Sequence, residues 1–205
     1  MTPAYWPRAV AHLAANDPVL ARLIAAYPSE RLVCRGDAFG TLVRAIIGQQ
    51  ISVRAAQSVA LRIERALGGI NPRALAAASD DALFACGLSR QKLHYLKDLA
   101  GNFLSGAVDP THWPEQDDQR VTAELTRVKG IGPWTAHMFL IFNLMRPDVL
   151  PLDDIGLQRA MGRHYRGDGK LDRAEIETIA ARWRPWRSVA TWYLWRSLDP
   201  LPVEY

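Results

Sequence analysis

Cysteine is scarce in this sequence. Among its 205 residues only Cys34 and Cys86 are cysteines, and they lie far apart. Structural zinc and iron–sulfur sites need several closely spaced thiolate or imidazole ligands. We therefore expect no metal–sulfur cluster, and interpret both cysteines as free thiols in a reducing compartment.

Long apolar runs are also missing. The longest run, near Met138 to Leu144, is far shorter than the roughly 20 residues that a membrane-spanning helix needs. Residues 1–15 lack the basic region, apolar core and cleavage site of a secretory signal. We expect a protein without membrane partners that works in the cytoplasm, at the nucleoid.

The excess of positive charge is small. The chain has 25 Lys and Arg against 21 Asp and Glu, a net charge of +4 and a pI of about 9.3. This balance permits a polyanionic partner but does not demand one. The length and the 49% of hydrophobic residues suffice for one core or for two small lobes.

Hydrophobic residues recur at helical spacing, and no pair of strands is convincing, so we predict an all-α fold. Asp17 before Pro18 is a typical helix start, and Ser52 fits the N-cap of a helix that runs to Leu67. Residues 111–119 are polar and contain proline, which predicts a surface loop. The clearest buried stripe consists of Phe39, Leu42, Val43, Ile46 and Ile47.

The stretch from Leu125 to Gln158 carries the strongest signal. Gly130-Ile131-Gly132 interrupts one helix pattern, and Pro133 suits the first position of the next helix, which predicts a helix-hairpin-helix. Backbone N–H groups at such a helix start can bind a phosphate. An ordinary turn between helices is the alternative.

An acidic pair, Asp153-Asp154, follows at a third helix start. Backbone N–H groups and the helix dipole favour a carboxylate there by about 0.3–1 kcal/mol. Capping alone is therefore the structural alternative to a catalytic role. The functional interpretation is an ionised carboxylate that stabilises positive charge developing in a reaction.

These residues resemble the helix-hairpin-helix DNA glycosylases of the HhH-GPD superfamily, and most of all their 3-methyladenine DNA glycosylase II branch. The resemblance extends over most of the chain in the family's order. It rests on Leu125-x-x-Val128-x-Gly130-Ile131-Gly132-x-Trp134-Thr135-Ala136, on Asp154 after Pro151, and on Ile46–Ser52, Gly87–Lys92 and Trp183–Ser188.

The resemblance implies the chemistry. Asp154 would be the catalytic carboxylate that acts when the N-glycosidic bond breaks. Relatives that also cut the backbone have a lysine two residues after the second hairpin glycine, and here that residue is Trp134. The expected enzyme is therefore a monofunctional hydrolase without lyase activity, and the cysteine cluster of the endonuclease III branch is absent.

The resemblance also assigns binding residues. Trp134, Trp195 and Met138 would line the base pocket, where indoles would stack on a cationic base. The residues expected at DNA are Gln49, Gln50, Lys129, Gly130, Ile131, Gly132 and Thr135, with Gln50 as the wedge that replaces a flipped base. The carbonyls of Thr126, Val128 and Gly130 would hold a Na⁺ or K⁺ ion, and no other cofactor is expected.

The expected architecture is a two-lobed helical fold with the active-site cleft between lobes. Lobe A would span about residues 37–146, with the helix-hairpin-helix at 121–145, and lobe B residues 1–36 plus 147–205. The expected function is excision of 3-methyladenine and 7-methylguanine from duplex DNA by a monomer. The alternatives are a glycosylase for mismatched adenine or deaminated bases, and a non-catalytic damage-binding module.

Overall fold

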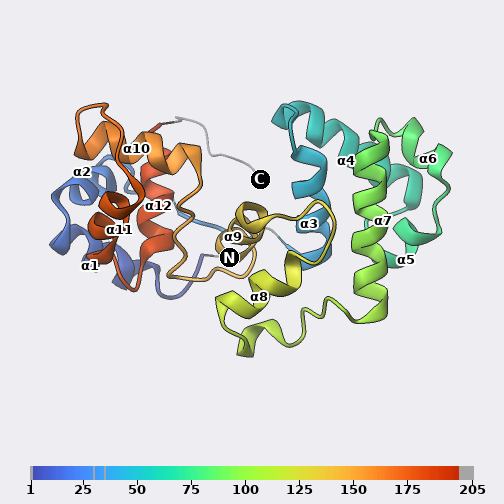
Figure 1. Ribbon diagram of the computed structural model, residues 1–205, viewed down its shortest axis with the longest axis horizontal. Coiled ribbons are helices and arrows are strands. Elements are labelled where there is room, and N and C mark those ends of the chain that lie inside the picture. Colours follow the sequence, from blue (N-terminus) through green and yellow to red (C-terminus); the bar gives the residue numbers. More distant parts are fainter. Residues whose placement is uncertain (1, 30, 35, 199–205) are drawn as a thin grey trace. The chain divides into compact units, whose positions relative to one another are not determined.

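The computed structural model describes residues 2–29, 31–34 and 36–198 (Figure 1). Regular structure in these ranges consists of α-helices and one short 3-10 helix, with no strand, so the predicted all-α class is confirmed. No helix in the described ranges is long and apolar enough to cross a membrane.

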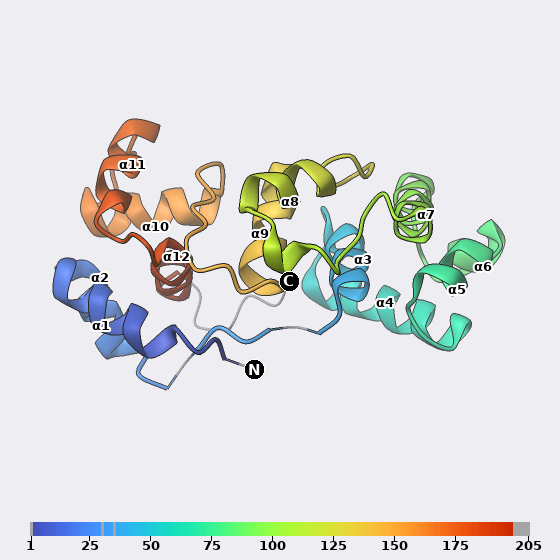
Figure 2. The same ribbon diagram turned by 90° about the horizontal axis from the view of Figure 1, so that it is seen from below.

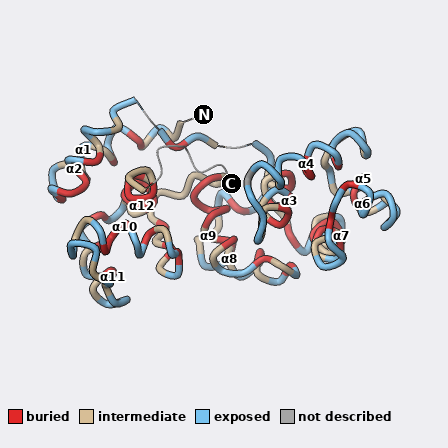
Figure 3. Tube along the Cα trace, turned by 90° about the horizontal axis from the view of Figure 1, so that it is seen from above, coloured by how far each residue is buried: buried red, intermediate tan, exposed pale blue. Residues whose placement is uncertain are grey.

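Contacts divide the described residues into two compact units. Unit 1 comprises residues 2–29, 31–34 and 140–198, and unit 2 comprises residues 36–139. The chain therefore starts in unit 1, passes through unit 2, and returns to unit 1 within a helix. Each unit has its own set of buried residues (Figure 3).

Unit 1 is built around its last helix. Its helices are α1 (Trp6–Asn16), α2 (Pro18–Ala26), α10 (Ile155–Tyr165), α11 (Arg173–Ala181) and α12 (Arg187–Arg196). Helix α12 packs against α1, α2 and α10, as Figure 2 shows. Seven of its residues, Ser188–Thr191 and Tyr193–Trp195, are buried, which is typical of a helix enclosed on most sides.

A buried carboxylate joins three parts of this unit. Asp17, 1% exposed, caps α2 as predicted: its Oδ1 accepts hydrogen bonds from the N–H groups of Val19 and Leu20 at 2.9 and 3.2 Å. Its Oδ2 accepts from the Tyr165 hydroxyl at 2.8 Å and from the Trp183 indole N–H at 2.9 Å. Four donors thus compensate the cost of burying this carboxylate.

Unit 2 is arranged around α7, which packs against α3, α5 and α6 (Figure 1). Its elements are α3 (Ala38–Gly48), α4 (Val53–Leu67), α5 (Pro72–Ala77), α6 (Asp80–Ala85), α7 (Arg90–Ser105), the 3-10 helix η1 (Trp113–Glu115), α8 (Asp118–Leu125) and α9 (Pro133–Phe142). The last three residues of α9 belong to unit 1. Ser52 caps α4, and this helix ends at Leu67, both as predicted.

The prediction of a surface loop at residues 111–119 was wrong. The segment holds η1 and the start of α8, and Trp113 is fully buried. The indole N–H of Trp113 donates to Glu124 at 2.9 Å, and its ring packs edge-on against Phe139 with centroids 5.2 Å apart. Burial of one large aromatic side chain, with a hydrogen-bond partner for its N–H, therefore determined the structure of this segment, although most of its residues are polar.

Candidate active site and DNA-binding elements

The two acidic residues at the start of α10 have different surroundings. Asp154 is the N-cap: its Oδ1 accepts a hydrogen bond from the N–H of Leu157 at 2.6 Å, and the residue is 6% exposed. The side chain of Asp153 is 73% exposed and pairs with Arg173 at 3.2 Å. The structure thus places Asp154 at the N-cap and Asp153 in a surface ion pair.

Trp195 of α12 contacts the same carboxylate. Its indole N–H donates to Asp154 Oδ1 at 2.7 Å, and the Phe142 ring stacks on the indole with centroids 5.8 Å apart at 14°. Two predicted site residues, far apart in sequence, are therefore brought together. Their donors and the N-terminal end of α10 fix a negative charge in a place largely screened from water.

Gly156, which was not predicted as a site residue from the sequence, makes this contact feasible. A Cβ at this position would lie 3.0 Å from Asp154 Oδ1 and 3.1 Å from Trp195 Cδ1. Both distances are shorter than ordinary contacts, so a side chain would displace the indole or the carboxylate. A glycine two residues after an N-cap aspartate was the available signal.

Replacement of Trp195 by phenylalanine tests whether the indole N–H fixes the carboxylate. A hydrogen bond to a charged group contributes about 1.5–3 kcal/mol, so Trp195→Phe should lower the rate of the Asp154-dependent reaction roughly 10- to 100-fold. Trp192→Phe, on the same helix but edge-on to Trp6, is the control and should keep the rate. Equal kinetics of the two variants would contradict a role for the indole N–H.

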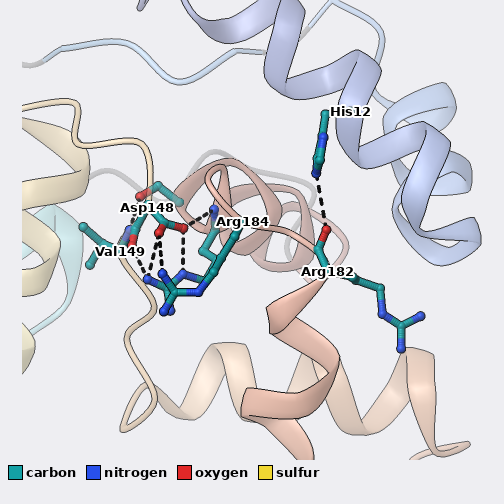
Figure 4. Close-up of polar contacts among 7 residues, drawn as sticks. His12, Asp148, Val149, Arg182 and Arg184 are labelled. Carbon is teal, nitrogen blue, oxygen red and sulfur yellow. Dashed lines mark hydrogen bonds and ion pairs between the residues drawn. The ribbon is translucent and has the colours of Figure 1, made fainter.

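The segment before Asp154 is anchored to the start of α12. The Asp148 carboxylate accepts hydrogen bonds from Arg187 Nε at 2.7 Å and Nη2 at 2.9 Å, and from Arg184 at 3.2 Å. The N–H of Val149 donates to Ser188 Oγ at 2.9 Å. Figure 4 shows these contacts with Asp148, Val149 and Arg184 labelled, beside the separate contact of His12 with the Arg182 carbonyl. The ion pair between Arg187 and Asp148, with two hydrogen bonds, fixes the position of this segment relative to α12.

The predicted helix-hairpin-helix is formed by α8 and α9. Leu125, Val128 and Ile131 are buried, and the N–H of Ile131 donates to the carbonyl of Val128 at 3.1 Å. Gly130 has a φ of 85°, a conformation that favours glycine. The hairpin residues expected at DNA thus lie between α8 and the N-terminus of α9.

Helix α7 supports the hairpin through residues that were not predicted from the sequence. Asp98 Oδ2 accepts a hydrogen bond from the backbone N–H of Lys129 at 2.9 Å. The Tyr95 ring lies against Gly130 so closely that a Cβ there would overlap it. The Lys129 side chain, 58% exposed, lies 3.8 Å from Asp98 and 3.4 Å from His94.

Gly130→Ala should therefore destabilise the protein and loosen the hairpin. Strained backbone costs about 1–3 kcal/mol, and the Tyr95 ring would have to move as well. Gly132→Ala is the control, because a Cβ there meets no atom within 4 Å. Urea unfolding should show a loss only for Gly130→Ala, and equal stabilities would mean that Tyr95 adapts without cost.

Gln49 and Gln50 lie directly after α3 and differ in their contacts. The Gln49 side-chain amide donates to the Gly130 carbonyl at 2.8 Å, which joins the turn to the hairpin. Gln50 is exposed and has a φ of 59°. Both predicted DNA residues thus belong to one surface element of unit 2.

The remaining predicted residues are distributed over both units. Trp134 is half-buried, whereas Thr135 and Met138 are 6% and 4% exposed, and all three lie in the unit 2 part of α9. Asp154 and Trp195 belong to unit 1. The common base pocket expected for Trp134, Met138 and Trp195 therefore stays a prediction.

The sequence matches a known family. The family model of the HhH-GPD superfamily of base excision DNA repair proteins matches residues 43–187. The chain is 35% identical over 197 residues to DNA-3-methyladenine glycosylase 2 of Escherichia coli, covering 90% of this chain and 66% of that protein. It spans 61% of another matched relative, from Bacillus subtilis.

Solved structures give the same result. A crystal structure of a DNA-3-methyladenine glycosidase from Bacillus halodurans matches with a TM-score of 0.83 at 34% identity, covering 96% of this chain and 92% of that one. The Schizosaccharomyces pombe 3-methyladenine DNA glycosylase Mag1, in complex with abasic DNA, matches with a TM-score of 0.80 at 28% identity, covering 93% and 96%. The expected glycosylase fold is confirmed.

Proposed function

Because the chain belongs to the HhH-GPD superfamily of base excision DNA repair proteins, we propose that it is a monofunctional DNA glycosylase for alkylated bases. Its substrates would be bases of the 3-methyladenine and 7-methylguanine type in DNA. Relatives that bear the name of this activity match along most of the chain, and one solved relative is bound to abasic DNA, the product of such a reaction.

The observation that carries the proposal is the position of Asp154. Its Oδ1 accepts hydrogen bonds from the Leu157 N–H and the Trp195 indole N–H, and the residue is 6% exposed. Fixed dipoles around a carboxylate in a water-poor place allow it to stabilise developing positive charge without reorganisation. If Asp154 only capped α10, the hydrogen bond from the Leu157 N–H would be enough, and the hydrogen bond from the Trp195 indole would have no function.

Asp154 would act when the bond between C1′ of the sugar and the base nitrogen breaks. The bonding electron pair leaves with the base, and the sugar becomes oxocarbenium-like. The carboxylate stabilises this cation and orients a water molecule, whose oxygen bonds to C1′ while its proton passes to Asp154. The products are the free base and an abasic sugar.

Alkylation at a ring nitrogen makes this step easier. The base then carries a positive charge and leaves as a neutral molecule, so the site needs no strong general acid. Trp195, and Trp134 with Met138, would contact the base, and cation–π attraction would favour the charged base over a normal one by roughly 0.5–2 kcal/mol. Trp134 at the lyase lysine position supports hydrolysis without strand cleavage.

DNA would be held by unit 2. The hairpin N–H groups and Lys129 would bind phosphates, with Thr135 beside them. Gln50 would enter the duplex as the wedge, and Gln49 would lie beside it at the DNA-binding surface. The carbonyls of Thr126, Val128 and Gly130 would hold a Na⁺ or K⁺ ion, which would add positive charge near a phosphate. The fit is acceptable, because Val128 and Gly130 each accept one hydrogen bond and a carbonyl has two lone pairs.

A base-release assay tests the proposal. The protein is incubated with duplex DNA methylated by an alkylating agent, and released bases are identified by chromatography. We expect 3-methyladenine and 7-methylguanine, with strand breaks only after later alkali treatment. The protein is proposed to act in the cytoplasm and as a monomer. For a monomer, the rate of base release per protein molecule should not depend on protein concentration.

Two other functions would give other results in this assay. A glycosylase of different specificity would release adenine from mismatches, or deaminated bases, but no methylated purine. A damage-binding module would bind the alkylated duplex and release nothing. Alkali-independent strand cleavage would contradict the monofunctional mechanism.

A further inference from the structure

The turn after α3 has a backbone conformation that needs support from its surroundings. Gln50 has a φ of 59°, which is rare for residues other than glycine. Its side chain is exposed, so packing of that side chain does not hold it in this conformation. Such a residue keeps its conformation only when the surrounding structure fixes its backbone.

Lys92 of α7 supplies this support on the N-terminal side. Its ammonium donates hydrogen bonds to the carbonyls of Ile47 at 2.6 Å and Gln49 at 2.7 Å. These carbonyls end α3, where the helix dipole favours a cation. Burial lowers the pKa of Lys92, and the same partial removal of water strengthens its hydrogen bonds.

Gln49 extends the support to the hairpin. Its side-chain amide donates to the Gly130 carbonyl at 2.8 Å, while its own carbonyl accepts from Lys92. The turn is thus held at its backbone by α7 and at a side chain by the hairpin, all within unit 2. Gln50, the next residue, projects from a turn fixed at two points.

We propose that Lys92 is a positioning residue that holds Gln50 ready to enter the DNA duplex where a base has been flipped out. The ammonium does not touch DNA itself; it sets the direction of Gln50 through the carbonyls of Ile47 and Gln49. This inference rests on the proposed function, because it concerns how Lys92 positions Gln50 at the proposed DNA-binding surface.

The chain contains a matched control on the same helix. Lys97 also donates to two carbonyls at a helix end, those of Ala76 at 2.9 Å and of Ala78, just after α5. Lys92 and Lys97 therefore perform the same structural task at different helix ends. Only the contacts of Lys92 lie next to Gln50.

The experiment compares Lys92→Met, Lys92→Arg and Lys97→Met. Methionine keeps most of the side-chain length and removes the donors, whereas arginine restores donors. Each protein is bound to a duplex in which a stable abasic analogue lies next to 2-aminopurine, whose fluorescence reports stacking. Rates of base release from methylated duplex and methylated single strands are measured alongside, and urea unfolding gives the stability.

We expect Lys92→Met to lose most of the fluorescence change on binding. Its rate constant for release from duplex should fall about 10- to 100-fold, as small misplacements of positioned groups do, with little change in KM. Release from single strands, which leave no hole in a duplex, should change far less. Lys92→Arg should recover part of the signal, and Lys97→Met should keep it at a similar stability.

Three results would overturn the proposal. Lys92→Met could keep the full fluorescence change, or it could lose signal and rate to the same extent as Lys97→Met. Lys92→Met could also reduce the rate of base release from duplex as strongly in a Gln50→Ala background as in the natural protein. That result would show that Lys92 does not act through Gln50. The fluorescence needs no base release, so it remains informative if the proposed function fails.

Discussion

Asp154→Asn is expected to reduce the release of methylated purines about 100- to 1000-fold while leaving the protein folded. Asparagine is a good N-cap, and its side-chain oxygen can still accept from the Leu157 N–H and from the Trp195 indole N–H. What it lacks is the negative charge. Removal of one preorganised electrostatic group from a water-poor site typically costs a factor of this size.

The measurement is single-turnover release of 3-methyladenine from methylated duplex, with thermal unfolding of both proteins. Asp153→Asn is the matched control, because Asp153 is the neighbouring carboxylate and forms only a surface ion pair with Arg173. It should release bases at the natural rate. Release by folded Asp154→Asn at the natural rate would remove the proposed mechanism and leave capping as the role of this residue.

Asp17→Ala is expected to lower the free energy of unfolding by about 3–5 kcal/mol. The substitution leaves the part-buried Tyr165 hydroxyl and the buried Trp183 indole N–H without their acceptor, and it removes the α2 cap. An unsatisfied buried donor costs about 1–3 kcal/mol, a part-buried one about 1 kcal/mol, and loss of a cap about 1 kcal/mol. This is a large part of the 5–15 kcal/mol typical of a folded domain.

Asp117→Ala is the control for the cap alone. Asp117 is an exposed N-cap that accepts from the N–H of Arg120 at 2.8 Å. Urea unfolding should show a loss of about 1 kcal/mol for this variant and a much larger loss for Asp17→Ala. Equal losses would mean that the tyrosine and tryptophan donors find other partners, such as water.

Local chemistry in the sequence was enough to predict most helix starts and the hairpin. Asp17, Ser52 and Asp154 each precede a helix and accept a backbone hydrogen bond, since short polar side chains satisfy N–H groups at helix starts. The glycines between α8 and α9 predicted the hairpin for a similar local reason, and Gly130 has the expected positive φ.

The sequence pattern could not predict which distant segments contact each other. Nothing near Trp113 indicates that it is buried against Phe139, and nothing near Lys92 indicates that it binds the end of α3. The period of a helix shows which side chains share a face, but not which other element covers that face.

The sequence by itself determined that this chain is helical, where its hairpin lies and which family it resembles, because caps, glycines and helical periodicity act over a few residues. Only the tertiary structure decided which aspartate of the pair is the buried one, and that Trp195 donates to it across 41 positions of sequence. The physical reason is that the burial and hydrogen bonding of a carboxylate depend on the groups that folding brings to it.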